Sequence, residues 1–276
     1  MRKKEIKKVV KESYAKIIRQ GGSCCGPVNS SYGGIDLTQD FLTKIGYTSE
    51  ELQAVPEGSI GIGCGNPVAL ASLREGETVL DLGSGAGFDC FLAANKVGKK
   101  GRVIGVDMTP EMVEKARENA KKGNYGNIEF RLGEIESLPV ADNSIDVIIS
   151  NCVINLSPDK RMAFKEAFRV LRPGGRLMVS DIVLLNELPG FIRDSIEAYI
   201  GCLSGAILKE DYMEAIREAG FHEVRIVDEI PFPIVDYMAN FSIGMVASSV
   251  ISIKVYGVKQ DVYKRDDNRR TKEASD

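Results

Sequence analysis

The stretch Val79-Leu80-Asp81-Leu82-Gly83-Ser84-Gly85-Ala86-Gly87 decides the fold of this chain of 276 residues. Its first half is a short apolar strand, and its second half is a glycine-rich turn that runs into a helix through Phe91 and Ala94. Glycines in such a turn let the backbone approach a nucleotide-like ligand closely, because no Cβ obstructs the approach. The stretch therefore predicts a strand, turn and helix that together bind a ligand of this kind.

Two acidic residues narrow the choice of ligand. Asp107 ends the next strand, where a carboxylate can accept both ribose hydroxyls. The turn has the spacing GxGxG, and Phe88 stands where a dinucleotide fingerprint has its third glycine. Asp81 precedes the turn, where its charge repels a pyrophosphate and suits a cationic ligand that carries an amino acid. Acids at both positions argue against a purely structural turn and favour the cationic ligand over NAD.

Strands alternate with helices outward from this unit. The expected strands are residues 78–82, 102–107, 128–132, 145–150, 176–182, 224–227 and about 245–255. Thr109 and Pro110 supply an N-cap and a first-turn proline for a helix that stops near Gly123. This alternation predicts an α/β fold, a doubly wound, mostly parallel, Rossmann-like sheet of seven strands with helices on both faces.

The chain divides into four expected segments. Residues 1–60 hold an amphipathic helix and an irregular glycine-containing stretch that contribute to the cover of the active site. Residues 61–185 form the ligand-binding core, and residues 186–260 supply substrate-binding helices and the last strands. Residues 261–276 are charged and lack apolar anchors, which predicts a disordered tail.

Composition excludes several partners. A formal net charge of -3 gives no electrostatic case for nucleic acid. Apolar runs such as Ile182 to Leu185 are far shorter than the roughly 20 residues of a membrane span, and no apolar signal region follows the lysine-rich N-terminus. We therefore expect a soluble cytoplasmic protein. In that reducing compartment the 6 cysteines point to metal binding, catalysis or burial, whereas a single histidine, His222, makes histidine-based sites improbable.

The glycine-rich stretch, Asp107 and the run Arg169-Val170-Leu171-Arg172-Pro173-Gly174-Gly175 resemble class I S-adenosylmethionine-dependent methyltransferases. The resemblance implies S-adenosylmethionine as cofactor and S-adenosylhomocysteine as product. In this superfamily the turn holds the methionine part, the acid after the second strand holds the ribose, and the acid after the third, here Glu134, lies by the adenine amino group. The implied cofactor-binding residues are Asp81, Gly83, Ser84, Gly85, Gly87, Asp107, Met108, Gly133, Glu134, Ile135 and Asn151.

Three cysteines carry the signal for the acceptor. Cys64 lies in a glycine-rich loop before the first strand, Cys152 follows the fourth strand, and Cys202 lies in the segment after the fifth. Ligands of open α/β sheets bind at the carboxyl ends of the strands, where these thiols can converge. Thiolates select soft metals and metalloids. Closed zinc sites need four ligands, often spaced C-x₂₋₄-C, and these cysteines lack that spacing. Trivalent arsenic takes three thiolates and keeps a lone pair that can attack a methyl group.

The stretches Gly63-Cys64-Gly65-Asn66-Pro67, Ser150-Asn151-Cys152-Val153-Ile154-Asn155-Leu156 and Gly201-Cys202 closely resemble arsenite methyltransferases. The resemblance implies that Cys152 and Cys202 bind As(III), that Cys64 takes part by thiol–disulfide exchange, and that all three are catalytic. It also implies As(III) as a glutathione or other thiol adduct, and thioredoxin or glutathione as reductant. The vicinal pair Cys24-Cys25 is a candidate for the further N-terminal cysteine of animal and algal members, although its spacing differs.

Other interpretations stay open at this point. Cys90 is expected to be a buried small side chain in the helix after the turn, and His222 a surface or strand-edge residue. One alternative is a class I methyltransferase for a small carbon or oxygen acceptor, which would not need the cysteines. The other is a non-catalytic arsenite-binding or redox-sensing protein, which would bind arsenite without consuming the methyl donor. The complete donor motif argues against this last alternative.

Overall fold

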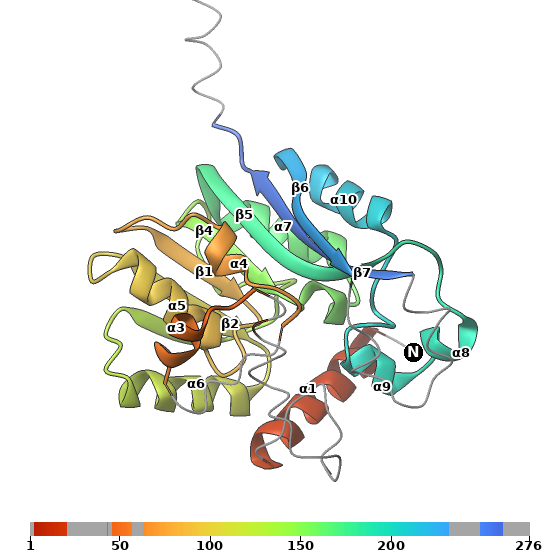
Figure 1. The fold of residues 1–276 in the computed structure, drawn as a ribbon, viewed down its shortest axis with the longest axis horizontal. Coiled ribbons are helices and arrows are strands. Elements are labelled where there is room, and N and C mark those ends of the chain that lie inside the picture. The colour runs from red at the N-terminus through yellow and green to blue at the C-terminus, as the bar shows by residue number, and fades with distance from the viewer. Residues whose placement is uncertain (1–2, 21–42, 44–45, 57–62, 232–248, 262–276) are drawn as a thin grey trace, which may run out of the picture.

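A single seven-stranded sheet organises the chain (Figure 1). The computed structural model describes residues 3–20, 43, 46–56, 63–231 and 249–261. The strands follow the order β3-β2-β1-β4-β5-β7-β6. The first five are parallel, and β7 runs antiparallel to both of its neighbours. This arrangement confirms the predicted Rossmann-like class I fold. The strands are β1 Thr78–Leu82, β2 Arg102–Asp107, β3 Ile128–Leu132, β4 Ile145–Asn151, β5 Leu171–Leu184, β6 His222–Pro231 and β7 Val250–Val258.

Helices cover both faces of the sheet. Side chains of α4, α5 and α6 share one buried cluster with Val79 and Val103, whereas those of α7 and α10 share another with Leu80 and Leu82. The helices are α1 Lys3–Gln20, α3 Ser49–Gln53, α4 Pro67–Leu70, α5 Phe88–Val97, α6 Pro110–Lys122, the 3-10 turn η1 Ile154–Leu156, α7 Lys160–Val170, α8 Gly190–Arg193, α9 Ile196–Ile200 and α10 Lys209–Glu218.

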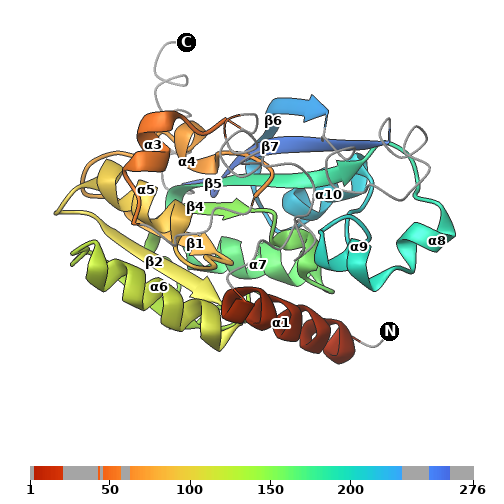
Figure 2. The same cartoon turned by 60° about the horizontal axis from the view of Figure 1, so that its bottom comes forward.

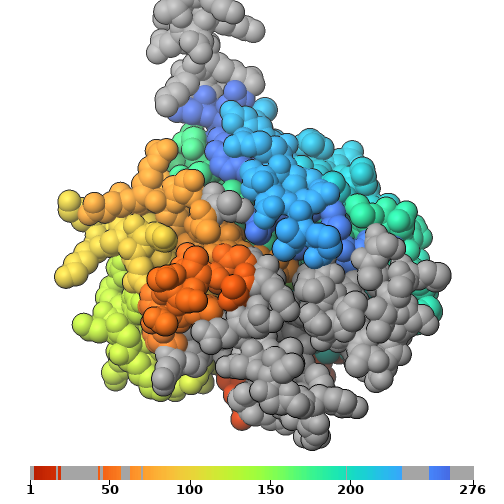
Figure 3. Space-filling view, in the orientation of Figure 1, coloured from red at the N-terminus to blue at the C-terminus, as the bar shows by residue number. Residues whose placement is uncertain are grey.

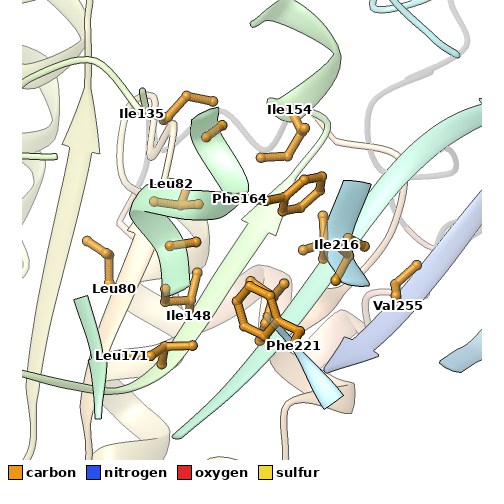
Figure 4. Close-up of a cluster of buried hydrophobic side chains, with 14 of the residues drawn as sticks. Leu80, Leu82, Ile135, Ile148, Ile154, Phe164, Leu171, Ile216, Phe221 and Val255 are labelled. Atoms are coloured by element: carbon orange, nitrogen blue, oxygen red, sulfur yellow. The ribbon is translucent and has the colours of Figure 1, made fainter. Parts of the chain in front are cut away.

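Successive residues of the central strands enter opposite cores, because side chains alternate across a strand. Leu80 and Leu82 of β1 join Ile148 of β4 and Phe164 of α7 in the cluster drawn in Figure 4. The ring of Phe164 meets that of Tyr212 edge to face at a centroid distance of 5.4 Å, within the range of roughly 4.5–7 Å that such pairs prefer. Apolar layers therefore pack on both faces of the sheet and keep the carboxyl ends of its strands in fixed positions, where a site can form.

The sequence-based bounds differ from the structure at the start of β5, in the stretch before Pro67, and at the ends of β6 and β7, which span His222–Pro231 and Val250–Val258 instead of residues 224–227 and about 245–255. β5 begins at Leu171 instead of residue 176. Leu171 already pairs with Ile145 of β4, the pairing continues beyond an irregularity, and the Gly174 N–H donates to the Lys259 carbonyl. The stretch before Pro67, expected to be irregular, contains α3, which Thr48 caps in a reciprocal pair of bonds with Glu51. This short helix has no buried residue and lies on the face shown in Figure 3.

Thr109 stands at the predicted N-cap of α6, but its side chain makes no capping bond. The Asp107 carboxylate instead accepts the Thr109 N–H at 2.8 Å. His222 is exposed at the start of β6, the strand at one end of the sheet, as expected. Cys90 is fully buried in α5, also as expected.

Helix α1 lies against the end of the sheet beside α6 and α9 (Figure 2). Val10 is buried there, and Ile6 and Tyr14 pack on the same apolar cluster as Ile182 and Leu188. Ion pairs add to these contacts. The Lys7 ammonium lies 2.6 Å from Glu134 and 3.1 Å from Glu136, Lys3 meets Asp159, and Arg19 meets Glu111. The amphipathic pattern thus produces a helix that covers the carboxyl ends of the strands.

Some sequence-based expectations concern residues that the structure does not describe. The pair Cys24-Cys25 and residues 262–276 of the predicted tail lie outside the described residues. Among the helices of the described ranges, none is both long and apolar enough to cross a membrane.

Candidate active site

The glycine-rich turn opens a cavity at the end of β1. Gly83 has a φ of 66°, and a Cβ there would lie 2.0 Å from a methyl of Val153, so both conformation and space require glycine. Gly83, Ser84 and Gly85 line the cavity. Gly87 does not; a Cβ at this position would press on Phe130 and Phe91, so its role in the free protein is close packing of α5.

Asp107 stands where the ribose acid is expected. Its two oxygens accept the Gly85 N–H at 3.0 Å and the Thr109 N–H at 2.8 Å, which fixes the carboxylate at the cavity wall. Glu134 behaves differently. Its carboxylate is half-exposed and pairs with Lys7, while its neighbours Gly133 and Ile135 line the cavity. The contact of Glu134 with an adenine amino group stays a prediction.

Carboxylates dominate the charged groups of this cavity. Asp81, Asp89, Asp107 and Glu136 line it, and Lys7 is the cation among its lining residues in the described ranges. Burial raises the pKa of Asp81 well above its usual range, the Asp89 charge adds to this, and a bond from the Cys90 thiol opposes it. Burial likewise raises the pKa of Asp89 to about 6. A cationic ligand would relieve this crowding of like charges.

The structure brings the three predicted cysteines together beside that cavity. The Cys202 thiol donates to the Cys152 carbonyl at 3.0 Å, and the thiols of both Cys202 and Cys64 interact with that of Cys152. Cys64 and Cys202 are buried and Cys152 is half-buried. Burial, and then the neighbouring thiols, raise the pKa of Cys152 well above its usual range. The Cys152 thiol therefore stays protonated at neutral pH until a thiophilic ligand displaces the proton.

Both Cys152 and Cys202 have left-handed backbone, with φ of 57° and 65°. Such conformations are uncommon outside glycine and persist only where surrounding contacts hold them. The Cys152 N–H donates to the Ser180 carbonyl at 2.8 Å, and the Cys202 N–H donates to the Tyr199 carbonyl at 2.9 Å. The fold thus holds both residues in strained backbone conformations at the wall of the cavity.

Comparisons with known proteins identify the family of this chain. A family model described as a methyltransferase domain matches residues 73–220. The arsenite methyltransferase of Halobacterium salinarum is 48% identical over 249 residues, which cover 87% of this chain and 64% of the relative. The solved structure of an arsenic (III) S-adenosylmethionine methyltransferase from Chlamydomonas reinhardtii is 34% identical, with a TM-score of 0.65 over 83% of this chain and 76% of that one. The chain belongs to the arsenite methyltransferase family.

This family member spans only part of some relatives. The arsenite methyltransferase of Aquipseudomonas alcaligenes is 44% identical over 181 residues, which cover 63% of this chain and 52% of the relative. The chain thus spans about half to two thirds of the length of these two curated arsenite methyltransferases.

In this arsenite methyltransferase family member, Asn151 clamps the loop of Cys64. Its Oδ1 accepts the Cys64 N–H at 3.0 Å, and its Nδ2 donates to the Gly65 carbonyl at 2.7 Å. The same Nδ2 lies 2.8 Å from the Tyr47 hydroxyl and 3.0 Å from the Asp89 carboxylate, and Tyr47 donates to Asp89 at 2.6 Å. Asn151 lines the cavity, as predicted for a cofactor-binding residue, but its amide is engaged in holding Cys64.

Asp181, near the end of β5, is a fully buried carboxylate that was not among the predicted site residues. Its carboxylate lies so close to Cys64 and Cys152 that one oxygen and the two sulfurs are all within 4.8 Å of one another. Asn155 donates to Oδ1 at 2.8 Å and Tyr212 donates to Oδ2 at 3.1 Å. Burial raises the pKa of Asp181 to about 7. In this family member, a carboxylate held in a fixed position therefore lies beside the thiols of Cys64 and Cys152.

Most predicted site residues converge on one place. Cys64 lies behind the cavity wall, with Gly63 in the wall itself, and Gly87 and Glu134 stay outside it. The predicted residues that line the cavity are Asp81, Gly83, Ser84, Gly85, Asp107, Met108, Gly133, Ile135, Asn151, Cys152 and Cys202. Residues that were not predicted also line the cavity, among them Lys7, Val10 and Tyr14 of α1, Asp89 and Glu136. Of these five, Asp89 had a local signal in the sequence, because it lies two residues after Gly87 of the glycine-rich turn.

The clamp can be tested without arsenic. Asn151→Ala removes the side-chain hydrogen bonds by which β4 holds the loop of Cys64. It also deprives the Asp89 carboxylate and the Cys64 N–H of a hydrogen-bond partner each. We expect Cys64 to react with a thiol reagent at least about tenfold faster and the free energy of unfolding to fall by about 1–3 kcal/mol. Peptide mapping after timed alkylation and urea unfolding measure the two effects.

Tyr47→Phe is the matched control for Asn151→Ala. It removes one hydroxyl from the network but leaves both bonds between Asn151 and the Cys64 loop. Cys64 should therefore stay protected in Tyr47→Phe. Equal protection of Cys64 in Asn151→Ala and the wild type would show that Asn151 does not hold the loop.

Proposed function

We propose that the chain is an arsenite methyltransferase: it transfers methyl groups from S-adenosylmethionine to As(III) bound by Cys64, Cys152 and Cys202, and so serves arsenic detoxification. The observation that carries the proposal is the convergence of these three thiols beside a cavity lined by acids. Membership of the arsenite methyltransferase family supports the same activity.

The cavity residues fit the donor. S-adenosylmethionine, when bound, supplies a methyl group on a positively charged sulfur and is left as S-adenosylhomocysteine. Asp81, Asp89 and Glu136 provide negative charge around such a cation, and Asp107 presents acceptors for hydroxyls. Helix α1 closes one side of the cavity through Val10 and Tyr14, which excludes water from the reacting groups.

The thiols bind and orient the acceptor. Each arsenic–sulfur bond forms by exchange from a thiol adduct: the cysteine sulfur replaces the adduct's thiolate on arsenic, and the cysteine proton leaves with that thiolate as a free thiol. The raised pKa of Cys152 is therefore no obstacle to binding. Arsenic held by thiolates keeps its lone pair, which is the nucleophile and carries no proton. The site consequently needs no general base, and its main contribution is to hold the two reactants close together.

Methylation leaves arsenic pentavalent, and its return to the trivalent state takes two electrons. Two of the cysteines supply these electrons by forming a disulfide, which thioredoxin or glutathione reduces by thiol exchange. Arsenic reaches the site as an adduct of glutathione or another thiol and exchanges onto the cysteines. We place the protein in the cytoplasm, because the site works only when its thiols are returned to the reduced state.

The proposal is tested by incubating the full chain with arsenite, labelled S-adenosylmethionine and a thiol reductant. We expect methylated arsenic and S-adenosylhomocysteine in equal amounts per transfer, as measured by chromatographic speciation of arsenic. Arsenite bound without any consumption of the donor would instead support a binding or sensing protein. Label that moves to a quinone or other carbon acceptor, and not to arsenic, would support the remaining alternative.

A further inference from the structure

Cys64, Cys152 and Asp181 form a second kind of ligand set inside the thiol site. Each residue offers one ligand atom, the two sulfurs and a carboxylate oxygen, and these atoms all lie within 4.8 Å of one another. We propose that these residues, together with Cys202, bind a thiophilic divalent cation, Zn²⁺ or Cd²⁺, at the place where arsenite binds. The binding of the cation is independent of the proposed function, whereas its competition with arsenite rests on it.

The distances suit such a cation. A zinc–sulfur bond of about 2.3 Å in a tetrahedral site places two bound sulfurs about 3.8 Å apart. The sulfurs of Cys64 and Cys152 lie within 4.8 Å of each other, so a closure of about 1 Å at most brings them to that distance. Cys202 is the fourth ligand, because its thiol already interacts with that of Cys152. A set of three thiolates and one carboxylate is within the chemistry that Zn²⁺ accepts.

Asp181 is held in the manner of a metal ligand. Oδ1 accepts bonds from Asn155 at 2.8 Å and from the Ile182 N–H at 3.0 Å, so the carboxylate cannot turn away. Oδ2 accepts one bond, from Tyr212 at 3.1 Å, and keeps a further lone pair for a cation. Second partners of this kind orient ligating carboxylates in metal sites. Both Asp181 and Tyr212 are fully buried, which excludes water that would otherwise compete for the cation.

The carboxylate distinguishes the two ligands of the site. As(III) is satisfied by three thiolates, so it gains little from an oxygen ligand. A divalent cation needs a fourth ligand and carries a charge that a carboxylate neutralises. Asp181 therefore belongs to the cation site and not to the arsenic site, although Cys152 serves both.

The test is a titration of the full reduced chain with CdCl₂ or ZnCl₂ under anaerobic conditions. Cys24 and Cys25 are replaced by serine in every variant, because this vicinal pair is a competing thiol site. We expect one tightly bound cation per chain, seen by calorimetry and, for cadmium, by thiolate-to-metal absorption. Asp181→Asn should weaken cation binding at least about tenfold and change arsenite binding less than threefold.

Tyr212→Phe supplies a second variant that keeps every ligand and the edge-to-face ring contact with Phe164. It removes the bond to Asp181 Oδ2 and should weaken cation binding by about tenfold, the usual effect of losing a second partner. Cation affinity that is equal in the wild type, Asp181→Asn and Tyr212→Phe would overturn the proposal, as would cation binding that survives Cys152→Ser. Cation binding that depends on Asp181 in a chain that does not methylate arsenite would refute the proposed function and leave the cation site standing.

Discussion

Replacing Cys152 by serine is expected to lower arsenite methylation to below about 1% of the wild-type rate. Cys152 is the central member of the thiol group, because its side chain interacts with both Cys64 and Cys202. A hydroxyl is a hard, protonated group that does not replace a soft thiolate on arsenic. Cys202→Ser removes an outer thiol and should also lose most of the activity. The measurement is the initial rate of methyl transfer to arsenite at saturating donor.

Cys90→Ser is the matched control for these variants. Cys90 is equally buried, but its thiol donates to Asp81 and lies outside the thiol group. A serine hydroxyl can make the same bond, so Cys90→Ser should bind arsenite like the wild type. Calorimetric titration with S-adenosylmethionine should give unchanged affinity in Cys152→Ser, which separates loss of the acceptor site from loss of the fold. Normal methylation of arsenite by both Cys152→Ser and Cys202→Ser would end the proposed function.

Asp107→Asn is expected to weaken the binding of S-adenosylmethionine by about 100-fold. The carboxylate already accepts two backbone N–H groups, and its remaining lone pairs are the acceptors for the ribose hydroxyls. An amide loses one acceptor and points N–H donors at the Gly85 or Thr109 N–H. Two weakened bonds to a charged group, at about 1.5 kcal/mol each, correspond to an affinity change of this size.

Calorimetric titration with S-adenosylmethionine and with S-adenosylhomocysteine measures the effect of Asp107→Asn. The two ligands share the ribose but differ in the charge on sulfur, so loss of the ribose contact weakens both equally. Asp142→Asn makes the same change at an exposed carboxylate paired with Arg169, and it should leave both affinities unchanged. Affinity for both ligands within threefold of the wild type in Asp107→Asn would place the ribose elsewhere.

Local sequence was sufficient for the frame of the donor site. A strand that ends in a glycine turn, followed by an acid at the end of the next strand, specifies backbone conformation and offset within 29 residues, from Val79 to Asp107. Gly83 shows why the pattern is readable: its left-handed φ and its contact with Val153 exclude any other residue. The place of Cys152 beside the donor site was also predictable, because parallel strands end at one edge of the sheet and Cys152 directly follows β4.

Other features existed only once distant segments had packed. Asn151 is a cavity residue by sequence, but its partners Cys64 and Tyr47 are 87 and 104 positions away, so its role as a clamp had no local signal. The pairing of Glu134 with Lys7 depends on where α1 docks, which periodicity alone does not specify. β5 extends to Leu171 because hydrogen-bond partners on β4 and beyond β7 are available to a Pro-Gly-Gly run that reads as a turn.

Asp181 illustrates the difference most clearly. In sequence it is an acid that follows a serine near the end of an apolar strand, with no motif around it. In the fold it lies within 4.8 Å of two thiols and accepts bonds from η1 and α10. Backbone conformation is set by neighbouring residues, and so motifs reveal it. The charge and ligand set around a buried group are sums over contacts from several elements, and only packing brings these elements together.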